Sequence, residues 1–112
     1  MESTRMLKIS RLIQKELAEY FRGAGTDLTL GSLISVTVVR VSPDLGMARV
    51  YLSIFPSEKA PEVVKVLGEN AKTIRFELGR KIAKQVRHIP ELKFFFDDSL
   101  DYAQRIDDLL KK

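Results

Sequence analysis

A predicted basic helix that leads directly into a predicted strand constrains the fold of this chain more than any other feature. The helical pattern extends from Lys72 to His88, and Pro90 prevents the helix from continuing. A hydrophobic strand is predicted from Lys93 to Phe96. At about 100° of turn per residue, the apolar residues of the helix fall on one wall, namely Ile74, Leu78, Ile82 and Val86. One side of the helix can therefore be buried while the other faces solvent.

The opposite wall of the same helix is strongly basic. The residues that fall close together there are Arg80, Lys84 and Arg87, with Lys81 and His88 at the edge. A dense positive surface predicts an extended anion as the partner, and RNA is the natural candidate. The formal net charge of +4 agrees with this prediction, but the clustering of the charge carries more weight than its total.

The whole chain predicts the element order α-β-β-α-α-β followed by a final helix, which is an α+β fold. The other predicted elements are a helix at Met6–Phe21, strands at Leu33–Val41 and Met47–Phe55, a helix from Ser57 or Ala60, and a final helix at Ser99–Leu110. Turn residues at 42–46 predict an antiparallel hairpin, and 26–32 is predicted to be a polar loop. Low helix propensity predicts a break between Gly68 and Thr73. We expect a single domain over residues 1–112, with helices covering a three-stranded sheet and residues 99–112 packed on it or partly mobile.

Composition and motif content argue against several classes of function. The chain has no cysteine and one histidine, so neither a disulfide nor a metal site is expected. Asp97, Asp98 and Asp101 are predicted to cap the final helix. No nucleophile–base set or phosphate-binding glycine loop supports an enzyme, a cofactor or a small-molecule substrate. No apolar run approaches the ~20 residues of a membrane span, and no signal peptide is recognised, so we expect a cytoplasmic protein. Because no long heptad pattern or obvious unpaired apolar face is recognised, we expect a monomer.

A second basic stripe and one unusual arginine complete the candidate RNA-binding surface. Lys8, Arg11 and Lys15 stack on one side of the first helix, either as an ordinary solvated face or as an RNA contact. Arg75 falls near the middle of the apolar wall. It is either a snorkelling or salt-bridged residue that helps to hold the break, or a residue that contacts phosphate. The full candidate set is Lys8, Arg11, Lys15, Lys72, Arg75, Arg80, Lys81, Lys84 and Arg87.

Aromatic residues in the strands have two interpretations. Phe94 and Phe96 are predicted to be core residues at strand spacing. Phe95 and Tyr51 are predicted on the other face, where the final helix can cover Phe95 or the rings can stack on bases. Both interpretations stay open at this point.

The predicted element order is that of a type II KH domain, a small RNA-binding fold. An ordinary KH domain clamps single-stranded nucleic acid with a Gly-x-x-Gly loop between its two central helices. This chain has Gly68-Glu69-Asn70-Ala71 in that region, which lacks the second glycine and adds a carboxylate that repels phosphate. The standard KH clamp is therefore not expected.

The chain resembles a narrower family, ribosome-binding factor A of bacteria, over essentially its whole length. The segments that carry the resemblance are Val36-Thr37-Val38, Ser42-Pro43-Asp44-Leu45, Ala48-Arg49-Val50-Tyr51-Leu52-Ser53, Ile74-Arg75, Leu78-Gly79, Pro90-Glu91-Leu92-Lys93-Phe94 and Asp97-Asp98-Ser99. The resemblance implies a type II KH-like fold with a mixed sheet, in which an Ala-x-Gly kink replaces Gly-x-x-Gly. Ala71-Lys72-Thr73 aligns with that kink. Because β-branched Thr73 disfavours a left-handed backbone, we expect a shallower or shifted kink.

The same resemblance implies a role in ribosome assembly. It implies binding to the small (30S) ribosomal subunit and its rRNA, assistance in late maturation and processing of the 16S rRNA, and a role in growth at low temperature, with ribosomal proteins as further candidate partners. Many family members carry a charged C-terminal tail, and because this sequence ends at Lys112, no function of such a tail is expected. Two alternatives remain: a general single-stranded RNA-binding KH module, and a basic module that docks an acidic protein.

Overall fold

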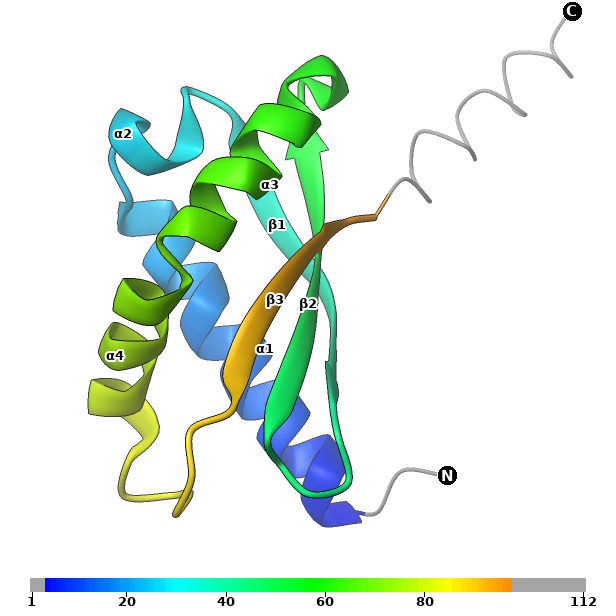
Figure 1. The fold of residues 1–112 in the computed structure, drawn as a ribbon, viewed down its shortest axis with the longest axis vertical. Helices are drawn as coiled ribbons and strands as arrows, with labels where there is room; N and C mark the ends of the chain where they lie inside the picture. The colour runs from blue at the N-terminus through cyan, green and yellow to red at the C-terminus, as the bar shows by residue number, and fades with distance from the viewer. Residues whose placement is uncertain (1–3, 98–112) are drawn as a thin grey trace, which may run out of the picture.

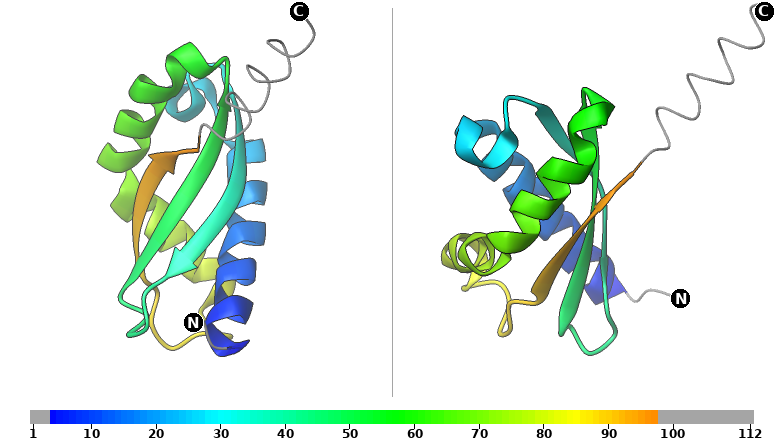
Figure 2. Two further views of the ribbon diagram at one scale, coloured as in Figure 1. Left: turned by 90° about the vertical axis from the view of Figure 1, so that its right-hand side faces the viewer. Right: turned by 45° about the horizontal axis from the view of Figure 1, so that its top comes forward.

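The computed structural model describes residues 4–97, which form a three-stranded sheet with its main helices on one side (Figures 1 and 2). In chain order the elements are α1 (Thr4–Gly23), α2 (Thr26–Thr29), β1 (Leu33–Val41), β2 (Met47–Phe55), the 3₁₀ turn η1 (Ser57–Lys59), α3 (Ala60–Glu69), α4 (Ala71–Ile82) and β3 (Glu91–Phe96). This order confirms the predicted α+β class and is consistent with the KH-like arrangement.

The sheet is mixed, as predicted. Its order is β1-β2-β3, with β1 antiparallel to β2 and β3 parallel to β2. The hairpin turn is closed by Asp44, whose carboxylate accepts hydrogen bonds from the Ser42 hydroxyl (2.7 Å) and the Gly46 N–H (3.0 Å). The parallel pair requires a long crossover, which α3 and α4 provide while they cover the sheet.

The core lies between the sheet and the helices, because alternate residues of each strand face the same side. The inward residues of β2 are Ala48, Val50, Leu52 and Ile54. The helices meet them with Ile13, Leu17 and Phe21 of α1 and with Ile74, Leu78 and Ile82 of α4. The ring of Phe21 contacts Phe94 of β3 edge-on, with centroids 6.2 Å apart. The apolar wall predicted for the basic helix is therefore confirmed as far as Ile82.

The prediction that the basic helix reaches His88 is wrong. α4 ends at Ile82, and residues 83–85 form a turn in which the Gln85 N–H donates to the Ile82 carbonyl (2.9 Å). A helix continued to His88 would carry the chain about 9 Å beyond Ile82. Only two residues would then remain to return the chain to Glu91, where β3 begins. The position of β3 in the sheet therefore ends the helix early.

The predicted break between the central helices is confirmed, and it lies one residue before the aligned kink segment. α3 ends at Glu69, and Asn70 adopts φ −104° and ψ 11°. The Asn70 side-chain amide donates to the Val66 carbonyl (2.8 Å) and helps to satisfy the end of α3. Ala71-Lys72-Thr73 forms the first turn of α4. Thr73 thus keeps the right-handed conformation that suits a β-branched residue, and the break is shifted.

Smaller differences concern element ends. β1 and β2 have the predicted bounds, whereas α1 is longer than Met6–Phe21 and β3 begins before Lys93. The predicted polar loop at 26–32 contains the short α2, and the Lys59 ammonium of η1 holds the end of this helix by donating to the Leu30 carbonyl (2.9 Å). The predicted final helix lies outside the described residues, as do Asp98 and Asp101. Across residues 4–97, no helix is both long enough and apolar enough to cross a membrane.

Candidate nucleic-acid interface

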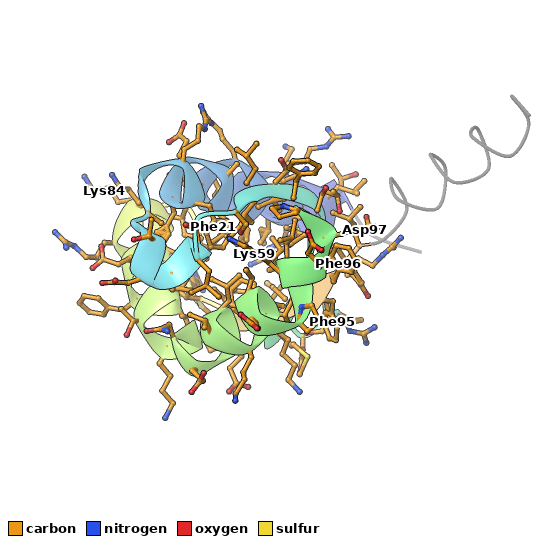
Figure 3. The ribbon with its side chains drawn as sticks, turned by 90° about the horizontal axis from the view of Figure 1, so that it is seen from above. Phe21, Lys59, Lys84, Phe95, Phe96 and Asp97 are labelled. Carbon is orange, nitrogen blue, oxygen red and sulfur yellow. The ribbon has the colours of Figure 1, made fainter. Side chains whose placement is uncertain are left out.

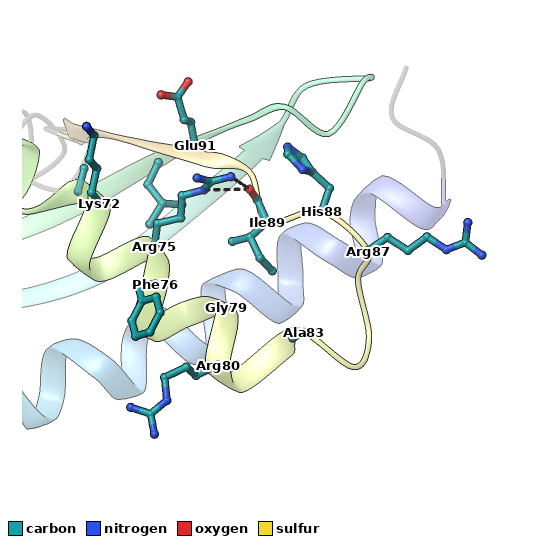
Figure 4. A pocket seen from close by; sticks show the side chains of 12 residues that line it. Lys72, Arg75, Phe76, Gly79, Arg80, Ala83, Arg87, His88, Ile89 and Glu91 are labelled. Atoms are coloured by element: carbon teal, nitrogen blue, oxygen red, sulfur yellow. Dashed lines mark hydrogen bonds between the residues drawn. The ribbon is translucent and has the colours of Figure 1, made fainter.

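A basic pocket of about 690 Å³ opens between α4 and the segment that leads into β3 (Figure 4). Its basic lining residues are Lys72, Arg75, Arg80, Arg87 and His88. Phe76 also lines the pocket and is 67% exposed. Glu91 is the one carboxylate among the lining residues. This site, called the α4 pocket below, therefore combines positive charge with an accessible aromatic ring.

Close packing of α4 against residue 89 forms one wall of the α4 pocket. A Cβ atom at Gly79 would lie 3.3 Å from Cγ1 of Ile89, which is tighter than an ordinary van der Waals contact. Glycine therefore lets the helix and this segment approach each other. Pro90 is fully buried beside them, so the chain turns beneath α4 and enters β3 at a fixed place.

Arg75 stabilises the wall of the α4 pocket. The side chain is half-buried, and its Nε donates to the carbonyls of Ile89 (3.0 Å) and Pro90 (3.2 Å). Its Nη2 also donates to the Ile89 carbonyl. Of the two interpretations of Arg75, these contacts support a structural role. The role differs in detail from the expectation, because the guanidinium holds the segment before β3 and not the break at Asn70.

Lys72 and Arg80 leave their charges accessible to a ligand. Both side chains are exposed. The Arg80 guanidinium lies 3.6 Å from the Glu77 carboxylate, and both groups of this pair face solvent. An exposed ion pair contributes at most about 1 kcal/mol, so an anionic ligand can compete with Glu77. Figure 4 shows Arg80 and Phe76 on the same side of α4.

The turn after Ile82 separates Lys84 and Arg87 from the helix. Because residues 83–88 are not helical, the prediction that Arg80, Lys84 and Arg87 share one helical wall is wrong. Arg87 nevertheless lines the α4 pocket, as it would need to do for a shared ligand. Lys84 does not line it, and Figure 3 shows its side chain directed away from the body of the protein.

The basic stripe on α1 is divided by the structure. Lys8 lines a second pocket of about 510 Å³, whose other charged lining residues are Arg5, Asp44 and Arg87; His88 also lines it. Lys8 is thereby brought close to the turn that follows α4. The hydrogen bond from Ser42 holds the pKa of Asp44 below its ordinary value, so this carboxylate stays charged at neutral pH. Arg11 instead lines a small pocket beside β1, and Lys15 is exposed on the helix surface.

Lys81 lies in acidic surroundings and not in the α4 pocket. It lines a pocket on the other side of α4 whose acidic lining residues are Glu16, Glu19 and Glu77. Burial, and then the negative charge of Glu77, raises the pKa of Tyr20 in the same pocket. Carboxylates around Lys81 oppose a phosphate ligand, which makes Lys81 the least suitable of the candidate residues on α4.

Phe76 and Arg5 are not among the site residues predicted from the sequence. Phe76 lies about 200° around the helix from Ile74 and therefore away from the apolar wall. An aromatic residue on the wet side of a basic helix was the available signal. Arg5 precedes the predicted start of the first helix, and its proximity to Arg87 depends on the packing of two distant segments.

Comparisons with known proteins agree with the fold and with the resemblance. A family model described as ribosome-binding factor A matches residues 5–110. Ribosome-binding factor A of Cytophaga hutchinsonii is 46% identical over 112 residues, which is 100% of this chain and 84% of that protein. The crystal structure of ribosome-binding factor A from Thermus thermophilus has a TM-score of 0.66 at 23% identity, covering 80% of this chain and 93% of that one. A homology model of the Thermus thermophilus factor, fitted into a cryo-electron microscopy map of its complex with 30S, has a TM-score of 0.59 at 21% identity and covers 88% of this chain and 97% of that one.

Proposed function

Because the chain belongs to the ribosome-binding factor A family, we propose that it binds the small ribosomal subunit and that the α4 pocket holds rRNA of that subunit. The observation that carries the proposal is that Lys72, Arg80 and Arg87 line the same pocket as the exposed ring of Phe76. Cations bind phosphate oxygens, and the ring offers a surface on which a base can stack. The complex of the Thermus thermophilus factor with 30S supports the choice of partner.

The proposed contact surface extends from the α4 pocket to the start of α1. Lys8 and Arg5 line the adjoining pocket with Arg87, so a backbone that leaves the α4 pocket meets further positive charge. Arg75 supports the surface from behind through its bonds to residues 89 and 90. The remaining candidates, Arg11, Lys15, Lys81 and Lys84, line neither of these two pockets. Ribosomal proteins are further candidate partners.

We extend the proposal to late maturation and processing of the 16S rRNA. A protein that binds one RNA arrangement more tightly than another shifts the population toward the first by its differential affinity. Fixed basic residues favour the arrangement that presents phosphates at matching positions. Rearrangement of RNA over a barrier slows as temperature falls, which gives such a factor its largest effect during growth in the cold. The proposed role needs no catalytic group, and we assign it to a monomer in the cytoplasm, where subunits assemble.

Cosedimentation with purified small subunits, mature and immature, tests the proposal. The informative variant is Lys72→Gln/Arg80→Gln, in which glutamine preserves helix propensity while it removes two charges. Its matched control is Arg22→Gln/Lys65→Gln, which removes two exposed charges from residues outside both basic pockets. We expect salt-sensitive binding of the unchanged protein, about tenfold or more weaker binding of the α4 variant, and near-normal binding of the control.

Three results would contradict the proposal. The first is that the folded protein binds neither form of the subunit. The second is equal weakening by the α4 variant and its control, which would reduce the effect to net charge. The third is an affinity that does not change between low and physiological salt, since phosphate contacts require such a dependence. Capture of an acidic protein that persists after nuclease treatment would instead support the protein-docking alternative.

A further inference from the structure

Among residues 4–97, the helices leave one face of the sheet uncovered, and that face carries a row of three cations. The strand register places Arg40 opposite Arg49, and Arg49 beside Lys93, so the row crosses all three strands. All three side chains are exposed, and within residues 4–97 none of them lies within 4.0 Å of a carboxylate. Like charges in opposed positions destabilise a sheet. A row of three therefore indicates a role outside the stability of the free protein, and an anionic ligand is the natural one.

An aromatic pair lies in the next row of the same face. Tyr51 and Phe95 are neighbours in the β2–β3 register, and their rings are stacked, with centroids 5.4 Å apart and planes 27° apart. Phe95 is 39% exposed, and Val38 completes the row opposite Tyr51 on β1. Figure 3 shows Phe95 at the sheet side of the molecule, far from Lys84 on the helical side. Tyr51, Phe95 and Val38 are not among the residues that line the α4 pocket, so this apolar row is separate from it.

We propose that this face binds unpaired nucleotides of RNA, with bases stacked on the Tyr51–Phe95 pair and phosphates on the row of Arg40, Arg49 and Lys93. Rows on one face of a strand lie roughly 7 Å apart, so one nucleotide can reach both. Single-strand binding surfaces use this combination of a basic track with exposed rings. That the RNA is ribosomal rests on the proposed function; the capacity to bind unpaired nucleotides does not.

Acidic groups limit the platform at both ends. Glu91 lies in the row beyond Lys93, beside Met47. At the other end the Asp97 carboxylate accepts a hydrogen bond from the Thr37 hydroxyl (2.7 Å). Phosphates are therefore favoured only at the central row of cations, which fixes where the strand crosses the sheet.

The test is a titration of the full chain with a single-stranded oligouridylate of about ten nucleotides, followed by backbone amide NMR shifts. Three proteins are compared with the unchanged chain: Arg49→Gln/Lys93→Gln, Phe95→Leu, and the α4 variant Lys72→Gln/Arg80→Gln. Leucine keeps an apolar side chain of similar volume but cannot stack on a base. We expect shifts around Tyr51 and Phe95, roughly fivefold or more weaker binding of both sheet variants, and a smaller change in the α4 variant.

Unfolding in urea adds a readout that separates ligand binding from a structural role. Removing two of three opposed cations is expected to raise the urea midpoint of Arg49→Gln/Lys93→Gln while it weakens RNA binding. A lower midpoint would assign the row to the fold and overturn the proposal. So would shifts confined to the α4 pocket, or no binding of the oligouridylate. A contact between residues 98–112 and the Tyr51–Phe95 pair that RNA does not displace would identify the chain's own C-terminal segment as the occupant.

The same variants separate this inference from the proposed function. In one outcome, Lys72→Gln/Arg80→Gln loses small-subunit binding, whereas both sheet variants keep it and bind oligouridylate as the unchanged chain does. The proposed function then stands, and the platform is overturned. If the unchanged chain ignores the subunit but binds oligouridylate on the sheet face, the proposed function fails and the platform stands as a general RNA site.

Discussion

At the scale of single residues, Arg75 is expected to contribute more to stability than any other basic residue of the α4 pocket. Its guanidinium satisfies the carbonyls of Ile89 and Pro90, which the turn before β3 leaves without strand partners. Substituting Arg75→Met keeps the length of the side chain and removes these bonds. We expect the free energy of unfolding, measured in urea, to fall by about 1–2 kcal/mol.

The control for this prediction is Arg80→Met on the same helix. Among residues 4–97, Arg80 makes only an exposed ion pair with Glu77, so its loss is expected to change the free energy of unfolding by less than about 0.5 kcal/mol. Equal stability of the Arg75 and Arg80 variants would show that the bonds to Ile89 and Pro90 contribute nothing net.

At the scale of elements, the hydroxyl of Thr37 links β1 to the residue that follows β3. It lies within hydrogen-bonding distance of the Asp97 carboxylate (2.7 Å) and the Tyr51 carbonyl (3.2 Å), at the bulge where the β1–β2 register shifts. Thr37→Val preserves shape and strand preference but removes the donor. We expect it to lower the free energy of unfolding by about 1–2 kcal/mol, with Thr37→Ser losing less. An unchanged free energy of unfolding in the Thr37→Val variant would refute this role of the hydroxyl.

Element prediction from sequence succeeded where local chemistry decides and failed where tertiary position decides. The bounds of β1 follow from its β-branched residues and the turn after it, and those of β2 from alternation between that turn and Pro56. The break at Asn70 follows from low helix propensity nearby. The end of α4 at Ile82 does not follow from helix propensity, because Lys84 and Arg87 are acceptable in a helix. It depends on where β3 must enter the sheet beside β2, which no local pattern contains.

At the scale of the whole molecule, the candidate site shows the same division. Exposed cations on α4 were predictable from helical periodicity, and Lys72 and Arg80 keep that role in the α4 pocket. The row of Arg40, Arg49 and Lys93 was not predictable from the sequence, because its members come from three strands. The first two join through the hairpin register, whereas Lys93 joins only after the chain has crossed over through α3 and α4. Sequence spacing carries no information about that last neighbour.

The α4 pocket and the sheet platform have no cation in common and adjoin at Glu91, so one RNA-bearing partner can engage both at once. Each phosphate contact with single-stranded RNA contributes about 0.7 to the slope of log affinity against log salt concentration. We therefore expect Lys72→Gln/Arg80→Gln and Arg49→Gln/Lys93→Gln each to reduce the slope of small-subunit binding by about 1.4, and the quadruple variant by about twice that. Arg22→Gln/Lys65→Gln should leave the slope unchanged. The contrary result is a quadruple variant whose salt slope is no smaller than that of one of the double variants. It would mean that the subunit contacts only one surface at a time, because independent phosphate contacts add in the salt slope even where affinities do not.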